Sequence, residues 1–388
     1  MIKRIHSFLV FLFALPLLLL WACTEPFDAP IEDFEDILVI DAFITGELKT
    51  QEIFISRTFL SGEDIRFESG ATVQVADDAG NTFLFQEDEP GRYTSQIEFS
   101  AQADRLYSLS IVTQNGSSFS SGPTGMTGGS VLNDLEVSVT TNDDGQEGLS
   151  ILASGTGIGS SASFFRYDYV ETLQIVSPLG SNQDLVITSV NPPMFDLVTK
   201  TIEDRICYRT SNSQEIIIAS SENLSSNQIE DFEVRFIASN DFALRSRYSI
   251  LVNQYVQSAT AQSFYEDLRE FSNITTLFAQ TQPGFVQGNI DLDSPTGERV
   301  LGLFEVASVN SQRIFINRED FFSDTRPPFL IECNVLELGP ADPMLLQLIQ
   351  QGTHRLVSEG TGTFFIAETG CVDCTTFGTN VRPDFWED

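Results

Sequence analysis

Short runs of β-branched and aromatic residues, each ended by turn residues, recur along this chain and constrain its fold more than any other feature. In the first third of the chain they lie at residues 37–45, 52–58, 71–77, 82–86 and 106–114. Runs of this length and composition are typical of strands. Turn sequences such as Asp78-Ala79-Gly80-Asn81 separate them roughly every 8–12 residues, and this spacing predicts a β-sandwich. We therefore expect an immunoglobulin-like β-sandwich over residues 37–122.

The segment around Tyr107 supports an immunoglobulin-like topology. Asp104, Tyr107 and Leu109 resemble the tyrosine corner of such sandwiches, in which the phenolic hydroxyl ties a crossover loop to the fold. We expect Tyr107 to have this structural role. A stretch rich in serine and glycine follows, and it predicts a linker over residues 123–133.

The rest of the chain, residues 134–388, continues in strand-like runs and predicts a second, larger β-rich domain. Two short helices are expected within it. The first spans residues 259–271, where Ser258 can cap the start and apolar residues share one face. The second begins at Asp342-Pro343, because proline suits the first helical position, and ends at Gly352. The sequence thus predicts a mainly β protein rather than an α/β nucleotide-binding fold.

The N-terminus has the pattern of a lipoprotein signal peptide. The first four residues carry two positive charges, and an apolar run of about 14 residues follows, which would make roughly 21 Å of helix, short of the ~30 Å membrane core. Ala22 supplies the small residue before the cleavage point. We predict a signal peptide over residues 1–22, acyl lipid on Cys23 and an acidic tether over residues 23–36. The alternative is a signal peptide that is uncleaved or cleaved in the ordinary way, with Cys23 incidental.

The mature chain is strongly acidic. The formal charge of the whole sequence is −34, and loss of Lys3 and Arg4 with the signal peptide makes it −36. Such an excess repels phosphate backbones, so we expect no nucleic-acid partner. No later segment approaches the length of a membrane-spanning helix, which leaves the lipid on Cys23 as the predicted contact with the bilayer.

Four cysteines remain once Cys23 is lipidated. They are Cys207, Cys333, Cys371 and Cys374. An even number of cysteines in an oxidising compartment predicts two disulfides, for which three pairings are possible. The Cys371–Cys374 pair also permits a redox motif or half of a zinc site, but it lacks the thioredoxin-like context and the further ligands that those readings need.

Residues for catalysis are scarce. His354 is the one histidine of the mature chain, and no G-x-S-x-G sequence accompanies it, so we assign no catalytic residue. The glycines Gly155, Gly157 and Gly159 superficially resemble a phosphate-binding loop, but no Lys-Ser/Thr pair follows them. We interpret them as a flexible hairpin.

Carboxylates leave two weaker hypotheses open. Asp291, Asp293 and Glu298 lie close enough in sequence to bind one calcium ion, although they do not match an EF-hand loop; the alternative is a solvated loop. A pair of carboxylates could also hydrolyse glycosides, but the sequence singles out no pair. Apart from the lipid on Cys23 and possible calcium, no cofactor is expected.

The motifs together resemble an outer-membrane lipoprotein family of Bacteroidetes, of the domain-of-unknown-function 4249 type. The motifs that carry the resemblance are C-x-E-P-F (23–27), LVIDAFIT, SRT (56–58) with GATVQVAD, GRYTS, LYSLSI, FFRYDYVET followed by Cys207-Tyr208, YSILVNQY, GNI, VLGLFEVAS and CVDCTTFGTNVRPDFW. Many members have tryptophan where this chain has Tyr167, and Trp21 is unusual before the cleavage point.

The resemblance implies a protein anchored in the outer membrane, with an N-terminal immunoglobulin-like domain and no known catalytic residues. It implies a noncatalytic role in ligand capture or as an accessory partner of a TonB-dependent β-barrel transporter. An adhesion or envelope-scaffold protein that binds proteins or glycans is the alternative, and a carboxylate-dependent glycosidase is a third. The acidic tether resembles the surface-export signal of some Bacteroidetes lipoproteins, which favours the cell surface over the periplasmic face. The alternative is a plain linker, which leaves the side of the membrane undetermined.

Overall fold

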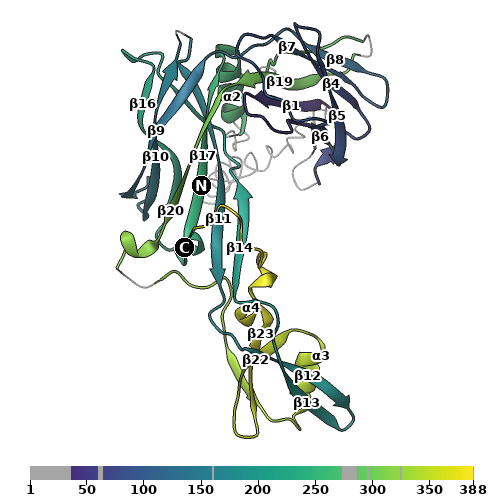
Figure 1. Ribbon diagram of the computed structural model, residues 1–388, viewed down its shortest axis with the longest axis vertical. Helices are drawn as coiled ribbons and strands as arrows, with labels where there is room; N and C mark the ends of the chain where they lie inside the picture. The colour runs from purple at the N-terminus through teal and green to yellow at the C-terminus, as the bar shows by residue number, and fades with distance from the viewer. Residues whose placement is uncertain are drawn as a thin grey trace, which may run out of the picture.

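The structure is a computed structural model that describes residues 36–59, 64–159, 161–272, 286–294, 297–323 and 326–387. The signal peptide, Cys23 and nearly all of the predicted tether lie outside these residues. The described part is mainly β, as the sequence predicts (Figure 1). None of its helices has the length and apolar character that a membrane crossing requires.

The first β unit is built on a single ten-stranded sheet. Along its path the strands are β18 (Ile290–Leu292), β8 (Ser118–Ser121), β7 (Tyr107–Val112), β4 (Thr72–Asp77), β5 (Thr82–Glu89), β6 (Arg92–Ser95), β2 (Glu52–Arg57), β1 (Leu38–Thr45) and β19 (Val300–Ala307), with β3 (Arg66–Phe67) beside β2. Alternation determines which face is buried: Leu38, Ile40, Ala42 and Ile44 of β1 enter the core, and the residues between them face outward. We call this part the N-terminal unit.

Two strands of the N-terminal unit come from far along the chain. Strand β19 pairs in parallel with β1, with Phe43 opposite Glu305, and β18 pairs with β8. The unit is therefore not the contiguous segment 37–122 that the sequence predicts. Parallel pairing leaves no turn between the partners, so local sequence patterns cannot reveal it.

The tyrosine-corner prediction agrees with the geometry around Tyr107. Its ring is buried, and its hydroxyl oxygen accepts a hydrogen bond from the backbone N–H of Gln102 at 2.8 Å. The side chain thus ties the loop before β7 to the strand, as in the corner of an immunoglobulin-like sandwich.

A second β unit, the central unit, consists of two facing sheets. One contains β16 (Gln228–Ala238), β10 (Glu147–Ile158) and β9 (Gly129–Thr141); the other contains β14 (Ile206–Asn212), β11 (Phe164–Val176), β17 (Tyr248–Gln257) and β20 (Val309–Ile316), with β15 (Ile217–Ser220) beside β11. Their inner faces share one large hydrophobic core. The predicted linker over 123–133 is partly wrong, because β9 begins at Gly129 and adds these residues to a sheet.

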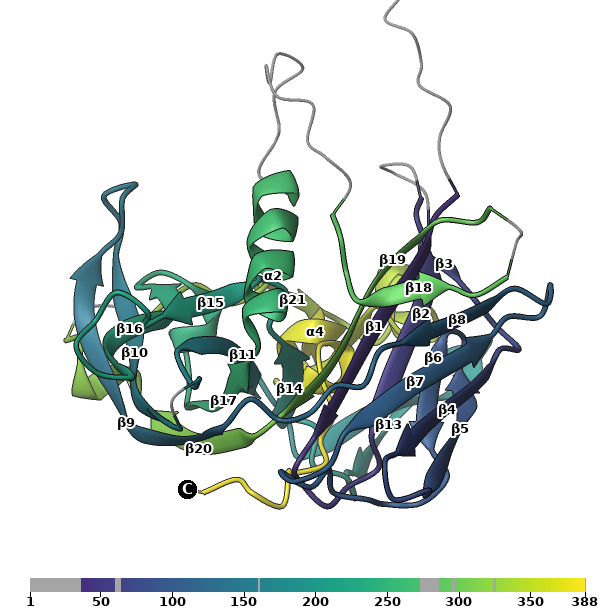
Figure 2. The same ribbon diagram turned by 90° about the horizontal axis from the view of Figure 1, so that it is seen from above.

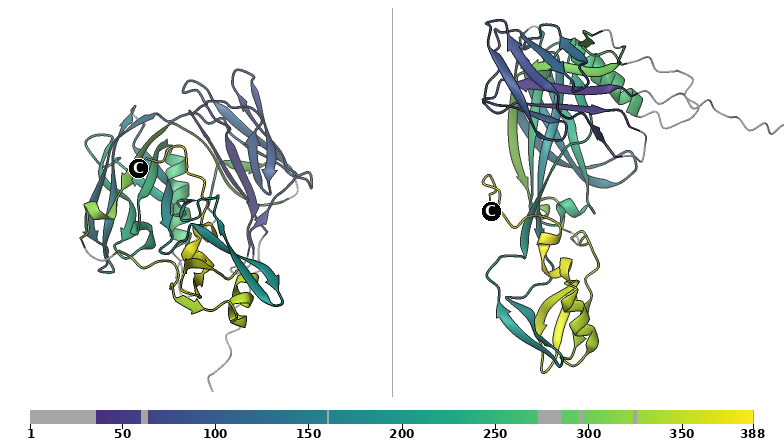
Figure 3. Two further views of the ribbon diagram at one scale, coloured as in Figure 1. Left: turned by 60° about the horizontal axis from the view of Figure 1, so that its bottom comes forward. Right: turned by 90° about the vertical axis from the view of Figure 1, so that its right-hand side faces the viewer.

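Residues from two separate segments form an arm that projects away from both units (Figures 1 and 3). Its elements are the hairpin β12 (Gln183–Val190) and β13 (Pro193–Thr199), the sheet of β21 (Val335–Leu338), β23 (Phe364–Glu368) and β22 (His354–Glu359), and the helices α3 (Pro343–Gln350) and α4 (Thr369–Val372). Both predicted helices are present, as α2 (Ala259–Ser272) and α3, and the Asp342 side chain caps α3. The arm itself was not predicted.

Two disulfides hold the base of the arm, as the cysteine count predicts. Cys207 of β14 is bonded to Cys374, and Cys333 is bonded to Cys371. The two cysteines of the C-x-x-C motif therefore have different partners, and they form neither a redox pair nor a zinc half-site. The first bond joins the central unit to the arm, and the second closes a loop within the arm.

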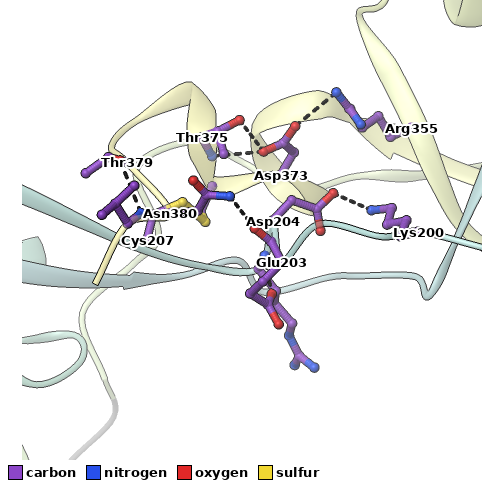
Figure 4. The surroundings of a disulfide bond; sticks show 12 residues. Lys200, Glu203, Asp204, Cys207, Arg355, Asp373, Thr375, Thr379 and Asn380 are labelled. Atoms are coloured by element: carbon purple, nitrogen blue, oxygen red, sulfur yellow. Dashed lines mark hydrogen bonds and ion pairs between the residues drawn. A yellow bond between two sulfur atoms is a disulfide. The ribbon is translucent and has the colours of Figure 1, made fainter. Parts of the chain in front are cut away.

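Charged side chains surround the first disulfide (Figure 4). Lys200 forms ion pairs with Asp204 at 2.5 Å and with Asp184 at 3.8 Å, and Arg355 pairs with Asp373 at 3.0 Å. Asp373 and Lys200 have nearly buried side chains. Buried charges of this kind need their partners. The pair between Arg355 and Asp184 at 3.6 Å connects the two segments of the arm to each other, and the disulfide attaches the arm to the central unit.

Candidate functional site: a polar cleft between two β units

A cleft of about 500 Å³ lies between the N-terminal unit and the central unit. One wall is the outward face of β1 and β2, and the other is the outward face of β11 and β17. Figure 2 shows these two units side by side, with α2 rising next to them. The lining residues are Asp41, Phe43, Thr45, Lys49, Thr50, Gln51, Glu52, Phe54, Arg166, Asp168 and Tyr255.

The alternation of each strand places the polar residues in the cleft. In β1, Asp41 and Phe43 point away from the core that buries Ile40 and Ala42. In β11, the even-numbered residues Arg166 and Asp168 face outward, whereas the residues on either side of them are buried in the central unit. Two sheets that each bury one face thus meet through their polar faces.

Asp41 lies on the wall of the cleft formed by β1. Its side chain is open to the water in the cleft, and no described residue donates a hydrogen bond to it or forms an ion pair with it. The surrounding protein raises the pKa of its carboxyl above its ordinary value by burial; nearby Arg166 acts against this, and the negative charge of Asp168 adds to it. A carboxyl with a perturbed pKa in a cleft is a candidate functional group.

Arg166 forms the opposite pole of the cleft. Its guanidinium carbon lies 4.1 Å from the ring centroid of Phe43, 5.0 Å from that of Tyr255 and 5.2 Å from that of Tyr265. Its Nη1 donates a hydrogen bond to the hydroxyl of Tyr265 at 2.8 Å. Among the described residues, no carboxylate lies within ion-pair distance of it. Aromatic faces thus stabilise the cation in place of a direct counter-ion.

Asp168 is held in a fixed orientation. The Asn253 side-chain amide donates a hydrogen bond to it at 2.6 Å, and Ser311 donates to the other end of Asn253 at 2.7 Å. These residues lie opposite one another on β11, β17 and β20. Burial raises the pKa of the Tyr255 hydroxyl, and the negative charge of Asp168 adds to this.

Glu305 of β19 lies opposite Phe43, a lining residue of the cleft, in the sheet register. It is 2 % exposed and accepts hydrogen bonds from the backbone N–H of Ser258 at 2.9 Å and from its hydroxyl at 3.2 Å. Burial raises the pKa of Glu305 to about 7 despite these bonds. Ser258 in turn caps α2, the helix that carries Tyr265 to Arg166.

The calcium candidates are not brought together. Glu298 pairs with Arg57 at 2.8 Å, and Asp293 accepts a hydrogen bond from Ser120. Within the described ranges, no three His, Cys, Asp or Glu side chains form a group that could hold a metal ion. The structure therefore gives no support to a calcium site at Asp291, Asp293 and Glu298.

The glycine-rich segment is neither a phosphate-binding loop nor a hairpin. Gly155 and Gly157 lie inside strand β10. A Cβ atom on Gly155 would lie 2.0 Å from Oε1 of Gln254, and one on Gly157 would lie 2.0 Å from the carbonyl oxygen of Ala162. Close packing requires these glycines, which corrects the flexible-hairpin interpretation. His354 lies on β22 in the arm, outside the cleft, with Nδ1 3.1 Å from the hydroxyl of Thr353.

Sequence reasoning missed every charged residue of the cleft. A signal was nevertheless present, because Asp41 interrupts LVIDAFIT and the pair Arg166 and Asp168 interrupts FFRYDYV. Charges at the outward positions of otherwise apolar strands are also typical of a solvated sheet face, and only the meeting of two such faces makes a site.

Fold and cleft together define a mainly β protein whose two β units meet at a polar cleft and whose arm is fixed by disulfides. A family model described as "Domain of unknown function (DUF4249)" matches residues 24–313. The chain belongs to this family. The match ends within β20, so the C-terminal motif with Cys371 and Cys374 lies beyond it. No curated protein matches the chain.

Proposed function

We propose that this protein is a noncatalytic lipoprotein of the outer membrane that captures a small hydrophilic ligand in the cleft between its β units. In this proposal it acts as an accessory partner of a TonB-dependent β-barrel transporter. The observation that carries the ligand-capture role is the position of Asp41, which no described residue pairs, and Arg166 on opposite walls of one accessible cleft. Their free hydrogen-bonding capacity suits a polar ligand that replaces the water of the cleft.

The proposed attachment to the membrane is based on the signal-peptide pattern that ends at Cys23. Several acyl chains on one residue give stable attachment to a bilayer, whereas one chain gives only marginal binding. Growth with a radiolabelled fatty acid should label the protein, and Cys23→Ser should abolish the label. Label that persists in Cys23→Ser would place the lipid on another residue, and absence of label in the parent would contradict lipidation.

Cell-surface exposure is part of the proposal, supported by the acidic tether at residues 23–36. Protease added to intact cells should digest the protein if it faces outward. A protein that is digested only after the outer membrane is opened would be periplasmic.

The transporter partnership is tested by isolating the full lipidated chain from detergent-solubilised outer membrane. A β-barrel protein is expected to co-purify in a stoichiometric amount. A monodisperse lipoprotein without a barrel partner would contradict this part of the proposal.

An adhesion or envelope-scaffold role is the second candidate, and the arm favours it. Val190, Met194 and Val198 of the hairpin β12–β13 are 58 %, 56 % and 49 % exposed. Exposed apolar side chains on a projecting hairpin are typical of surfaces that contact other proteins. If this role is correct, changing all three to serine should reduce cell attachment and leave nutrient uptake intact. The capture role predicts the reverse for Asp41→Asn.

A further inference from the structure

We infer that the ligand of the cleft is a small zwitterion, an amino acid or a short peptide, whose ammonium group binds Asp41 and whose carboxylate binds at Arg166. This inference rests on the proposed capture function and specifies its ligand class. The geometry points to it because Asp41, which no described residue pairs, and Arg166, which has no described carboxylate at ion-pair distance, lie on opposite walls of the cleft. Glu52 of β2 lines the same wall as Asp41, and its side chain also has no described partner.

The acidic pole lies on the wall formed by the N-terminal unit. Asp41 stands between Phe54 of β2 and Leu303 of β19 in the sheet register. The nearest lysine at the rim, Lys49, is already paired with Glu47 at 3.0 Å. Asp41 is therefore free to accept hydrogen bonds from an ammonium group, and the exposed ring of Phe54 beside it adds an aromatic surface suited to a cation.

The basic pole lies on the wall formed by the central unit. The aromatic rings of Phe43, Tyr255 and Tyr265 hold the Arg166 guanidinium in place, so a ligand does not have to order it. A planar guanidinium with donors not already paired to a protein carboxylate is suited to binding a ligand carboxylate. Prior ordering of this kind increases affinity because less conformational entropy is lost on binding.

A ligand with only one charge would satisfy only one pole. A cation at Asp41 would be repelled by Arg166, and an anion at Arg166 would be repelled by both Asp41 and Asp168. The charges of Asp41 and Arg166 interact electrostatically, but the two side chains form no direct ion pair. A zwitterion replaces the intervening water and neutralises both poles at once, which is the arrangement with the least electrostatic cost.

Size and lining agree with a short peptide. The volume of about 500 Å³ is within the roughly 300–1,000 Å³ of small-molecule sites. Apart from the two poles, the lining includes the hydroxyl of Thr50, the rings of Phe43, Phe54 and Tyr255, and the charged side chains of Lys49, Glu52 and Asp168. The side-chain amide of Gln51 is already hydrogen-bonded to Thr45, Glu47 and Phe99 and is not available to a ligand. The rings suit an apolar side chain, and the Thr50 hydroxyl suits a peptide bond.

Calorimetric titration of the detergent-solubilised full chain tests this inference with three matched probes. Glycyl-phenylalanine carries both charges, its methyl ester keeps only the ammonium, and N-acetyl-glycyl-phenylalanine keeps only the carboxylate. We expect the unmodified dipeptide to bind at least about tenfold more tightly than either blocked form, the equivalent of losing roughly 1.4 kcal/mol at each pole. Equal binding of a blocked form, or no binding of the dipeptide, would overturn the inference.

Two variants assign the effect to the cleft. Asp41→Asn should weaken dipeptide binding at least tenfold and should abolish discrimination against the N-acetyl form. Asp41 accepts no hydrogen bond from the described residues, and burial raises the pKa of its carboxyl, so this variant should melt no lower than the parent. Asp196→Asn removes the same charge from the exposed face of β13 in the arm and should bind like the parent. Equal weakening by both variants would show a nonspecific charge effect and overturn the assignment.

Failure of this inferred ligand class can be distinguished from failure of the proposed transporter role. If the dipeptide fails to bind while a barrel still co-purifies, the zwitterionic ligand class is contradicted and the transporter partnership is retained. Absence of a barrel with the dipeptide bound would instead retain the ligand class and remove the transporter role.

Discussion

The guanidinium carbon of Arg166 lies 4.1 Å from the ring centroid of Phe43, and this contact joins the central unit to the N-terminal unit. Phe43 also packs edge-on against Tyr255, with centroids 4.9 Å apart. One aromatic side chain of β1 thus contacts both outward strands of the opposite wall. The same residues form the contact between the two units and line the cleft. The stability of this interface and ligand binding are therefore coupled.

Replacing Phe43 with leucine should weaken this joint. Loss of the cation–π contact and the ring pair is expected to reduce the free energy of unfolding by about 1–2 kcal/mol. Chemical denaturation measures the change. Phe67→Leu is the matched control, because Phe67 is 53 % exposed, and it should stay within about 0.5 kcal/mol of the parent. Similar losses in both variants would contradict a specific role for Phe43.

Glu305 should make stability depend on pH in a defined window. Burial raises its pKa from 4.5 to about 7, so the folded state binds a proton more tightly than the unfolded state. The resulting stabilisation is complete below pH 4.5 and is lost as the pH rises through about 7. Glu305→Gln should remove this dependence and should be more stable than the parent above pH 7, by about 1–3 kcal/mol.

Melting temperatures of the parent and of Glu305→Gln between pH 4.5 and 8 provide the measurement. Other titrating groups are common to both proteins and cancel in the difference. A constant difference across the whole range would mean that Glu305 is charged throughout in the folded protein.

Removing the disulfide between Cys207 and Cys374 should cost more stability than removing the one between Cys333 and Cys371. The first closes a loop with a sequence separation of 167, and the second one of 38. Chain-entropy arguments give losses of roughly 3–5 kcal/mol, larger for the longer loop. Paired Cys→Ala variants, which leave no unpaired thiol, can be compared by calorimetry. The reverse order would show that strain or local packing outweighs loop closure.

Gly155 should tolerate no side chain. A Cβ atom there would lie 2.0 Å from the Gln254 amide oxygen, which is also hydrogen-bonded to Tyr167. Gly155→Ala is expected to destabilise the fold by about 1–3 kcal/mol. Gly129→Ala in the neighbouring strand is the control, since its Cβ would meet Ile158 at an ordinary 3.7 Å. Thermal denaturation of both variants checks the difference, and equal melting temperatures would exclude the predicted clash.

Local sequence patterns predicted the local features of this protein well. The period-two alternation of β1, the cap and first-turn proline of α3, and the Tyr107 hydroxyl bonded to Gln102 all involve residues within a few positions of one another. Such features depend on backbone preferences and short-range hydrogen bonds, which the residues themselves specify.

The candidate site could not be predicted in the same way. Asp41 and Arg166 belong to strands more than 100 positions apart, and each has the appearance of an ordinary solvent-facing charge in its own strand. Only the packing of two sheets through α2 and β19 places them in one cleft.

By itself, the sequence determined a mainly β chain with an even set of four cysteines after Cys23 and with two capped helices. The tertiary structure alone decided which cysteines pair, that β19 completes the N-terminal unit beside β1, and that Asp41 faces Arg166. The physical reason is the range of the interactions. Strand periodicity and capping act over a few residues, whereas sheet pairing, disulfide partners and the cleft depend on contacts between distant segments, which form only when the hydrophobic faces of the units pack.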